Sequence, residues 1–178
     1  MKKLMIASAI AMTMAAGSAM AATDMGSQQN EIRFLGAVTE VTCDIDAVVD
    51  GAVNNVVQLG TVKKGEEGQV KNIVLKAKAG TTCESLDSKT ATITFNGPLG
   101  DEGLDNAKGT AKGATVALIA KNGKTQNQSI TKELTKIDFD ANKVNNEGYQ
   151  LTAQLKSDET TGSAGTFESA LGYAVTYQ

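Results

Sequence analysis

The chain has 178 residues, with 17 Lys and Arg against 20 Asp and Glu, two Cys, no Trp and no His. The lack of His excludes Ser/His/Asp and Cys/His nucleophile arrangements and most transition-metal sites. The formal net charge of −3 argues against the basic stripe that nucleic-acid-binding proteins present. We therefore expect no cofactor and no nucleic-acid partner.

The first 21 residues have the pattern of a secretory signal. Met1-Lys2-Lys3 is a short basic start, residues 4–16 are apolar without a charge, and Ala19-Met20-Ala21 places small residues where a signal peptidase cleaves. A membrane anchor is the alternative, but the apolar run is shorter than the roughly 20 residues that span a bilayer. Cleavage is expected before Ala22, which leaves enough chain for one domain with a core.

Residues 22–31, "ATDMGSQQNE", are polar and offer nothing to pack. They fit either a disordered terminus or the lead-in to an arm that need not fold onto its own domain. Composition alone does not choose between these two readings.

Cys43 and Cys83 are the two cysteines of the chain, and both follow the signal. In an oxidising compartment an isolated pair normally forms one disulfide. Closing a loop of about 40 residues contributes roughly 4 kcal/mol in the chain-entropy model. Two free thiols acting as ligands or nucleophiles are the alternative, but the pair lacks the close spacing of a redox or zinc motif. The sequence predicts the disulfide.

Short segments with alternating or β-branched apolar residues are predicted as strands. They are residues 32–45, 55–62, 70–78, 89–97, 114–121, 149–156 and 171–177. Residues 65–80 have apolar positions at helical spacing, but their β-branched content and Gly68 favour a strand. Asn122-Gly123 predicts a hairpin turn, and residues 97–113 predict a Gly-rich surface loop. The pattern is typical of an immunoglobulin-like β-sandwich.

Acidic residues before the second predicted strand resemble a calcium loop. They are Asp44, Asp46 and Asp50-Gly51, but Val48 and Val49 occupy the positions where an EF-hand needs its third ligand and its Gly. A structural turn is therefore favoured, and no metal site is expected. A carboxylate hydrolase remains formally open, although no acidic pair stands out.

The C-terminal strand ends the chain. Leu171, Tyr173, Val175 and Tyr177 alternate with small residues, and the protein stops one residue later. If the next strand of a sandwich is missing, this strand borders an open groove, whose unpaired backbone recruits other chains. An N-terminal arm from another copy can fill it by strand addition, and such a head-to-tail contact generates a filament.

The chain resembles the major pilins of chaperone–usher fimbriae, close to the type 1 and K99-like subunits. "IRFLGAVTEVTCDID" (residues 32–46) is similar to a donor strand with an internal Gly followed by the first disulfide Cys. "VVQLGTV" (residues 56–62) is similar to the segment that follows, and Cys83 stands where the second Cys does. Tyr177 is penultimate and Gly165 is fourteenth from the end, as in the family.

The resemblance implies three parts: a signal peptide at 1–21, a donor-strand arm at 22–38 and a pilin domain at 39–178. The domain would be an incomplete immunoglobulin-like sandwich that lacks its last strand. The implied donor residues are Ile32, Phe34, Gly36 and Val38. The implied acceptor and chaperone-recognition strand contains Gly165, Phe167, Leu171, Tyr173, Val175 and Tyr177.

The resemblance also implies partners and a function. A periplasmic chaperone would lend a strand to the groove, and at the outer-membrane usher the arm of the next subunit would replace it. The product would be a non-enzymatic subunit of adhesive surface fimbriae. A subunit that also binds a host glycan is the alternative, with residues 97–113 as its candidate surface. A separate tip adhesin would need a second domain.

Overall fold

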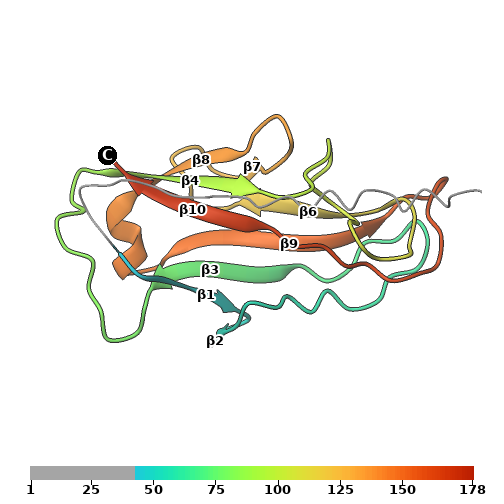
Figure 1. Ribbon diagram of the computed structural model, residues 1–178, viewed down its shortest axis with the longest axis horizontal. Coiled ribbons are helices and arrows are strands. Elements are labelled where there is room, and N and C mark those ends of the chain that lie inside the picture. Colours follow the sequence, from blue (N-terminus) through green and yellow to red (C-terminus); the bar gives the residue numbers. More distant parts are fainter. Residues whose placement is uncertain (1–42) are drawn as a thin grey trace, which may run out of the picture. The chain divides into compact units, whose positions relative to one another are not determined.

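The computed structural model describes residues 43–178, so the predicted signal and arm lie outside the described residues. Its larger sheet has the antiparallel strand order β2-β1-β3-β9-β6-β5, and β7 also pairs with β6 (Figure 1). These strands are β1 (Ile45–Val49), β2 (Ala52–Val53), β3 (Lys71–Ala77), β5 (Leu104–Asp105), β6 (Ala114–Ala120), β7 (Gln128–Ser129) and β9 (Tyr149–Ser157). The predicted strands 70–78, 114–121 and 149–156 are confirmed, and residues 71–77 are not helical.

The smaller sheet has the order β10-β4-β8. Its strands are β4 (Thr90–Asn96), β8 (Lys136–Asp140) and β10 (Gly172–Tyr177), and a short 3-10 helix, η1 (Ala141–Asn145), follows β8. The sequence predicted β4 and β10 but not β8. None of the described helical segments is long and apolar enough to cross a membrane.

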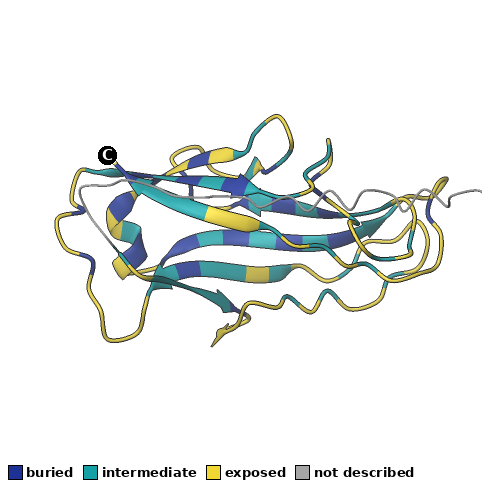
Figure 2. Ribbon diagram, in the orientation of Figure 1, coloured by how far each residue is buried: buried dark blue, intermediate teal, exposed yellow. Residues whose placement is uncertain are grey.

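Alternate side chains of both sheets form one hydrophobic core. In β4 the odd-numbered residues, including Ile93 and Phe95, are buried, and in β9 Tyr149 and Leu151 are buried. Figure 2 shows this alternation along the strands. The ring centroids of Phe139 and Tyr149 lie 4.9 Å apart, which joins the small sheet to the large one. This is the predicted two-sheet sandwich.

Residues 55–62 do not form the predicted strand. They run as irregular chain, in which Val57, Leu59 and Val62 are half-buried against the core. The alternating pattern therefore reports contact with the core and not a ladder of backbone hydrogen bonds. Period two is set by side-chain direction, and it does not require a neighbouring strand.

The two turn signals of the sequence have different outcomes. Asn122-Gly123 is not a tight hairpin turn, because β6 and β7 are joined by residues 121–127 and Asn122 instead bonds the backbone of Gly148 and Gln150. Asp50-Gly51 joins β1 to β2 with φ angles of +48° and +91°, as a type I′ turn requires. The favoured structural turn is confirmed, and no cluster of three potential metal ligands occurs within residues 43–178.

Cys43 and Cys83 form the predicted disulfide, across a sequence separation of 40 residues. Cys83 is held in turn by Asn145 of η1, whose side chain accepts from its N–H at 2.9 Å and donates to its carbonyl oxygen at 2.8 Å. The bond thus ties the chain just before β1 to the connection between β3 and β4.

Removing this disulfide by the double substitution Cys43→Ala and Cys83→Ala is expected to lower the unfolding free energy by roughly 4 kcal/mol, because the unfolded chain gains loop freedom. Urea unfolding of the two proteins measures the difference. Wild type treated with reductant is the matched control and should behave like the double variant. Labelling of denatured, unreduced wild type by a thiol reagent would contradict the pairing.

Candidate functional site: an unpaired edge before the C-terminus

Strand β10 lies at one edge of the small sheet and pairs with β4 alone among the described strands. Just beyond it, Gln178 and Thr90 exchange two backbone hydrogen bonds, at 2.9 and 2.8 Å. Hydrogen-bonded pairs alternate along an antiparallel ladder, so the even-numbered residues of β10 bond to β4. The N–H and C=O groups of Tyr173, Val175 and Tyr177 therefore point away from the sheet.

The same alternation continues before β10, where the chain is not part of a regular strand. The N–H of Thr166 donates to Thr110 Oγ1 at 3.0 Å, and its carbonyl oxygen accepts from the N–H of Ala111 at 3.0 Å. The carbonyl oxygen of Glu168 accepts from the N–H groups of Ala107 and Lys108. Thr166 and Glu168 are thus bonded to the loop 106–111.

The odd-numbered residues point the other way and make no backbone hydrogen bond within the described part of the chain. One row of outward N–H and C=O groups therefore runs from Gly165 to Tyr177, and we call this row the C-terminal edge. The predicted acceptor strand over 165–178 is a regular strand only from Gly172. The alternation of its peptide groups nevertheless continues, because the loop 106–111 bonds the first half of the predicted strand as β4 bonds the second half.

The inner face of the sandwich is only partly covered beside this edge. Val175 and Tyr173 lie opposite Ile93 and Phe95 of β4, which are buried, yet Tyr173 is 38% exposed. Figure 2 shows the exposed stretch of β10. Five apolar residues of β1 and of the C-terminal edge are only half-buried and pack on the core. They are Ile45 and Ala47 of β1, together with Phe167, Leu171 and Val175.

The inner face of β1 packs on the same core as the apolar residues of this edge. Ala47 lies directly across from the buried Leu75 and so shares the inner face of the large sheet. The pKa of the Tyr173 hydroxyl is raised by burial and by the charge of Asp46 in β1. We call the five half-buried apolar residues Ile45, Ala47, Phe167, Leu171 and Val175 the open face.

Tyr177 closes one end of the edge. Its side chain is 6% exposed, and it lies opposite Ala91 of β4. Its hydroxyl lies near that of Tyr149, which donates to the carbonyl oxygen of Ala141 at 2.9 Å. Burial raises the pKa of both phenols. The Tyr177 hydroxyl has no hydrogen-bond partner of good geometry within residues 43–178.

Gly165 lies at the other end of the edge, against the loop. A Cβ there would lie 2.4 Å from the backbone nitrogen of Ala111, so no side chain fits without moving the loop. The structure brings the predicted residues from Gly165 to Tyr177 to one edge, with Gly165 outside the regular strand. The predicted donor residues Ile32, Phe34, Gly36 and Val38 lie outside the described residues.

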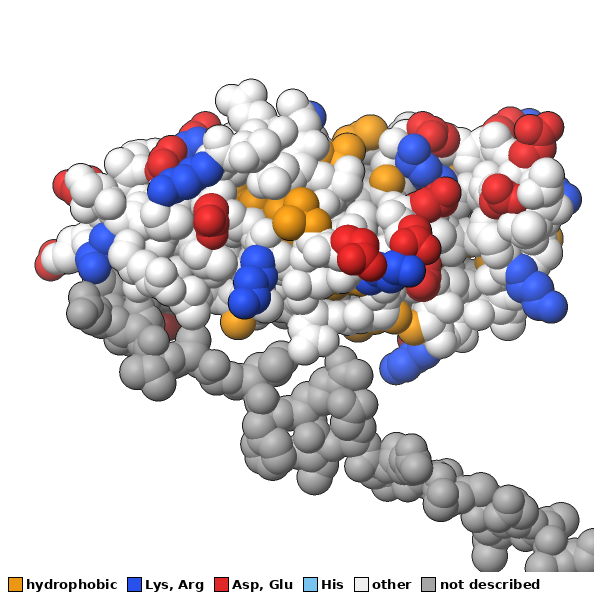
Figure 3. Space-filling model, turned by 90° about the horizontal axis from the view of Figure 1, so that it is seen from above, with side chains coloured by type: hydrophobic (Ala, Val, Ile, Leu, Met, Phe, Trp, Pro, Cys, Tyr) orange, Lys and Arg blue, Asp and Glu red, His pale blue; other side chains and the backbone are white. Residues whose placement is uncertain are grey.

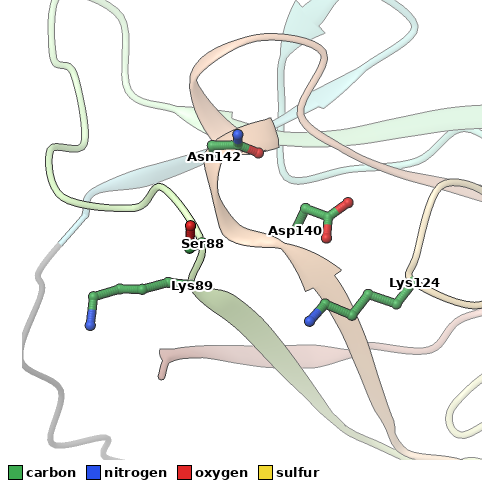
Figure 4. Close-up of a pocket in the computed structure, with 5 residues that line it drawn as sticks. All are labelled: Ser88, Lys89, Lys124, Asp140 and Asn142. Carbon is green, nitrogen blue, oxygen red and sulfur yellow. The ribbon is translucent and has the colours of Figure 1, made fainter.

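Other surfaces offer little chemistry. A shallow polar pocket is lined by Ser88, Lys89, Lys124, Asp140 and Asn142, without an aromatic side chain against which a sugar could stack (Figure 4). Acidic and basic side chains alternate over the face shown in Figure 3. Neither feature favours the glycan-binding alternative over a structural role.

A disulfide-linked, two-sheet sandwich in which one edge of β10 has no partner among the described strands is typical of the class of pilins, incomplete immunoglobulin-like subunits of pili. The chain belongs to the family of fimbrial proteins: it is 41% identical over 179 residues to the F107 fimbrial protein of Escherichia coli, covering 100% of both chains. It is also 29% identical over 171 residues to the K99 fimbrial protein of Escherichia coli, covering 90% of this chain and 93% of that protein.

The fold agrees with this family. The crystal structure of the P pilus rod subunit PapA is similar with a TM-score of 0.50 and 18% identity, over 83% of this chain and 100% of that one. No protein-family model matches the chain. Its membership of the fimbrial protein family makes the protein a structural subunit that polymerises into surface fimbriae.

Proposed function

We propose that subunits join by strand addition, in which the N-terminal arm of one copy (residues 22–38) pairs with the C-terminal edge of the next. The observation that supports this proposal is that the backbone groups of the odd-numbered residues from Gly165 to Tyr177 make no hydrogen bond within the described part of the chain. An exposed row of this kind is a template for another strand. Because donor and acceptor lie on different parts of the subunit, the contact is head-to-tail and extends without closing.

The composition of the arm suits the open face. Ile32, Phe34 and Val38 have the even spacing of one strand face, and each contributes about 1.5–3 kcal/mol when fully buried. Gly36 adds no side chain on that face. Each backbone hydrogen bond to the edge adds roughly 1 kcal/mol. Such a joint needs neither a cofactor nor catalysis.

Before assembly the same edge is a hazard, because it can recruit unrelated chains. We propose that the signal at 1–21 directs the chain to the periplasm, where a chaperone covers the C-terminal edge with a strand of its own. An outer-membrane usher then exchanges this strand for the arm of the next subunit. Chaperone and arm would contact the same residues, from Gly165 to Tyr177.

The substitution Val175→Pro tests this mode of assembly. The N–H of Val175 points away from β4, so proline removes no bond of the sheet, as is usual for proline in edge strands. It removes one donor of the C-terminal edge and obstructs the approaching strand. We expect filament yield to fall roughly tenfold or more, measured by electron microscopy, while the purified subunit keeps its circular dichroism spectrum.

Two matched variants are the controls. Val175→Ala removes side-chain volume but keeps the N–H, and it should still form filaments. Ala174→Pro removes a bond to β4 one residue away, and it should impair folding itself. Filaments of Val175→Pro at wild-type yield would contradict strand addition at this edge.

A further inference from the structure

The side chain of Asn106 connects the loop 106–111 to the first half of the C-terminal edge. We propose that Asn106 is a positioning residue for assembly, which turns residues 165–169 so that their free backbone groups face the incoming strand. This inference rests on the proposed strand addition and identifies a residue that controls how much of the edge takes part.

The half-buried Asn106 makes four hydrogen bonds, all to the backbone. Its Oδ1 accepts from the N–H groups of Gly109 and Glu168, both at 2.9 Å. Its Nδ2 donates to the carbonyl oxygens of Ala111 at 2.8 Å and Thr166 at 2.9 Å. Two of these bonds shape the loop and two hold the edge segment. Together they use both donors and both acceptor positions of the amide.

The first half of the edge depends on this loop for its direction. The register of β10 with β4 ends at Gly172 and Asn96, so no described strand of the small sheet pairs with residues 165–169. The bonds to Thr166 and Glu168 direct the even-numbered groups toward the loop. The groups of Phe167 and Ser169 must then point to the open side, because successive peptide groups alternate.

The close packing of loop and segment supports the same role. A Cβ at Gly109 would lie 2.0 Å from the carbonyl oxygen of Thr166, and one at Gly165 would lie 2.4 Å from the nitrogen of Ala111. The two stretches of backbone therefore touch at two places, between Gly109 and Thr166 and between Ala111 and Gly165. Without the amide, the carbonyl of Thr166 loses one partner and the N–H of Glu168 loses its side-chain acceptor. The segment then keeps only its bonds to Thr110 and to the backbone of residues 107, 108 and 111, and its orientation is held less firmly.

Amide hydrogen exchange in assembled filaments of the full exported chain tests the role of Asn106. In wild-type filaments the N–H groups of Phe167, Ser169, Val175 and Tyr177 should all be protected by the added strand. In filaments of Asn106→Ala, exchange at Phe167 and Ser169 should be on the order of tenfold faster. Protection at Val175 and Tyr177 should be unchanged, because β4 orients that half.

A second variant acts on the same segment without changing Asn106. Thr110→Val removes the hydroxyl that accepts from the N–H of Thr166, and it should produce a smaller acceleration at Phe167 and Ser169. Asn122→Ala is the control, since Asn122 also makes two side-chain bonds to backbone, at Gly148 and Gln150, away from the edge. It should leave exchange at both halves of the edge unchanged.

The outcomes separate this proposal from the one on which it rests. Unchanged exchange at Phe167 and Ser169 in both Asn106→Ala and Thr110→Val filaments would overturn the positioning role alone. An equal loss of protection at Val175 and Tyr177 would also overturn it, because the residue would then act on the whole strand. Fast exchange at Val175 and Tyr177 in wild-type filaments would instead overturn strand addition.

Discussion

Deletion of residues 22–38 is expected to abolish filament formation and to leave the subunit as a chaperone-bound monomer. The C-terminal edge is built from residues outside the deleted segment, so the variant keeps the proposed acceptor and loses the proposed donor. In the proposed joint, Ile32, Phe34 and Val38 would together supply several kcal/mol of apolar burial, at about 1.5–3 kcal/mol each. Since about 1.4 kcal/mol changes an equilibrium constant tenfold, the joint between subunits should be lost completely. Electron microscopy and co-purification with the chaperone measure the two parts of the result.

The head-to-tail direction of the joint gives this deletion a second consequence. A subunit without the arm can receive a neighbour's arm but cannot donate one, so it should end any filament that it enters. Co-expression of the deletion variant with wild type should therefore shorten filaments in proportion to its share of the subunits. Filaments of unchanged length, with the variant incorporated along them, would contradict the assignment of the donor.

The register within the arm can be tested at Gly36. The even-numbered positions of the arm are proposed to face the acceptor, so the side chain introduced by Gly36→Leu would enter the open face. Ala37→Leu adds a similar apolar side chain on the opposite side and is the matched control. We expect filament loss from the first variant and filaments from the second, compared at equal protein level.

Side-chain periodicity predicted β4, β6 and β9 because each of these strands has an alternating buried face. Ile93 and Phe95 of β4, and Tyr149 and Leu151 of β9, are buried as that pattern requires. Strand β8 alternates just as strictly, with Ile137 and Phe139 buried, but it has five residues and the sequence did not predict it. For residues 55–62 the alternation predicted a strand that does not form, since their alternate side chains reach the core although no described strand pairs with them.

The candidate site was predictable in its side chains but not in its backbone. The alternation from Phe167 to Tyr177 indicated which residues face inward, and the family resemblance indicated Gly165. The direction of the peptide groups before Gly172 depends on Asn106, which bonds to residues 60 and 62 positions away in the sequence. A lone Asn in a Gly-rich loop carries no local signal of such partners, since its bonds exist only after the loop has folded onto the segment.

Truncation of the penultimate residue should have a large effect on the subunit itself. Tyr177 is buried on the inner face of β10, opposite Ala91, so Tyr177→Ala removes a ring from the core. Losing a buried aromatic side chain costs about 3–5 kcal/mol, out of the 5–15 kcal/mol that usually stabilises a domain. We expect a marked fall in steady-state subunit and in chaperone-bound subunit, measured by co-purification at matched expression.

Two neighbouring substitutions assign this loss to the ring. Tyr177→Phe keeps the ring and removes a buried hydroxyl without a well-placed partner in the described part of the chain, so it should be recovered like wild type. Gln178→Ala keeps the two backbone bonds to Thr90, which do not involve the exposed Gln178 side chain, and should also change little. Recovery of Tyr177→Ala equal to wild type would mean that the end of β10 does not depend on the core. The C-terminal edge would then lack the rigid backing that an added strand needs, because edge and ring belong to the same three-stranded sheet.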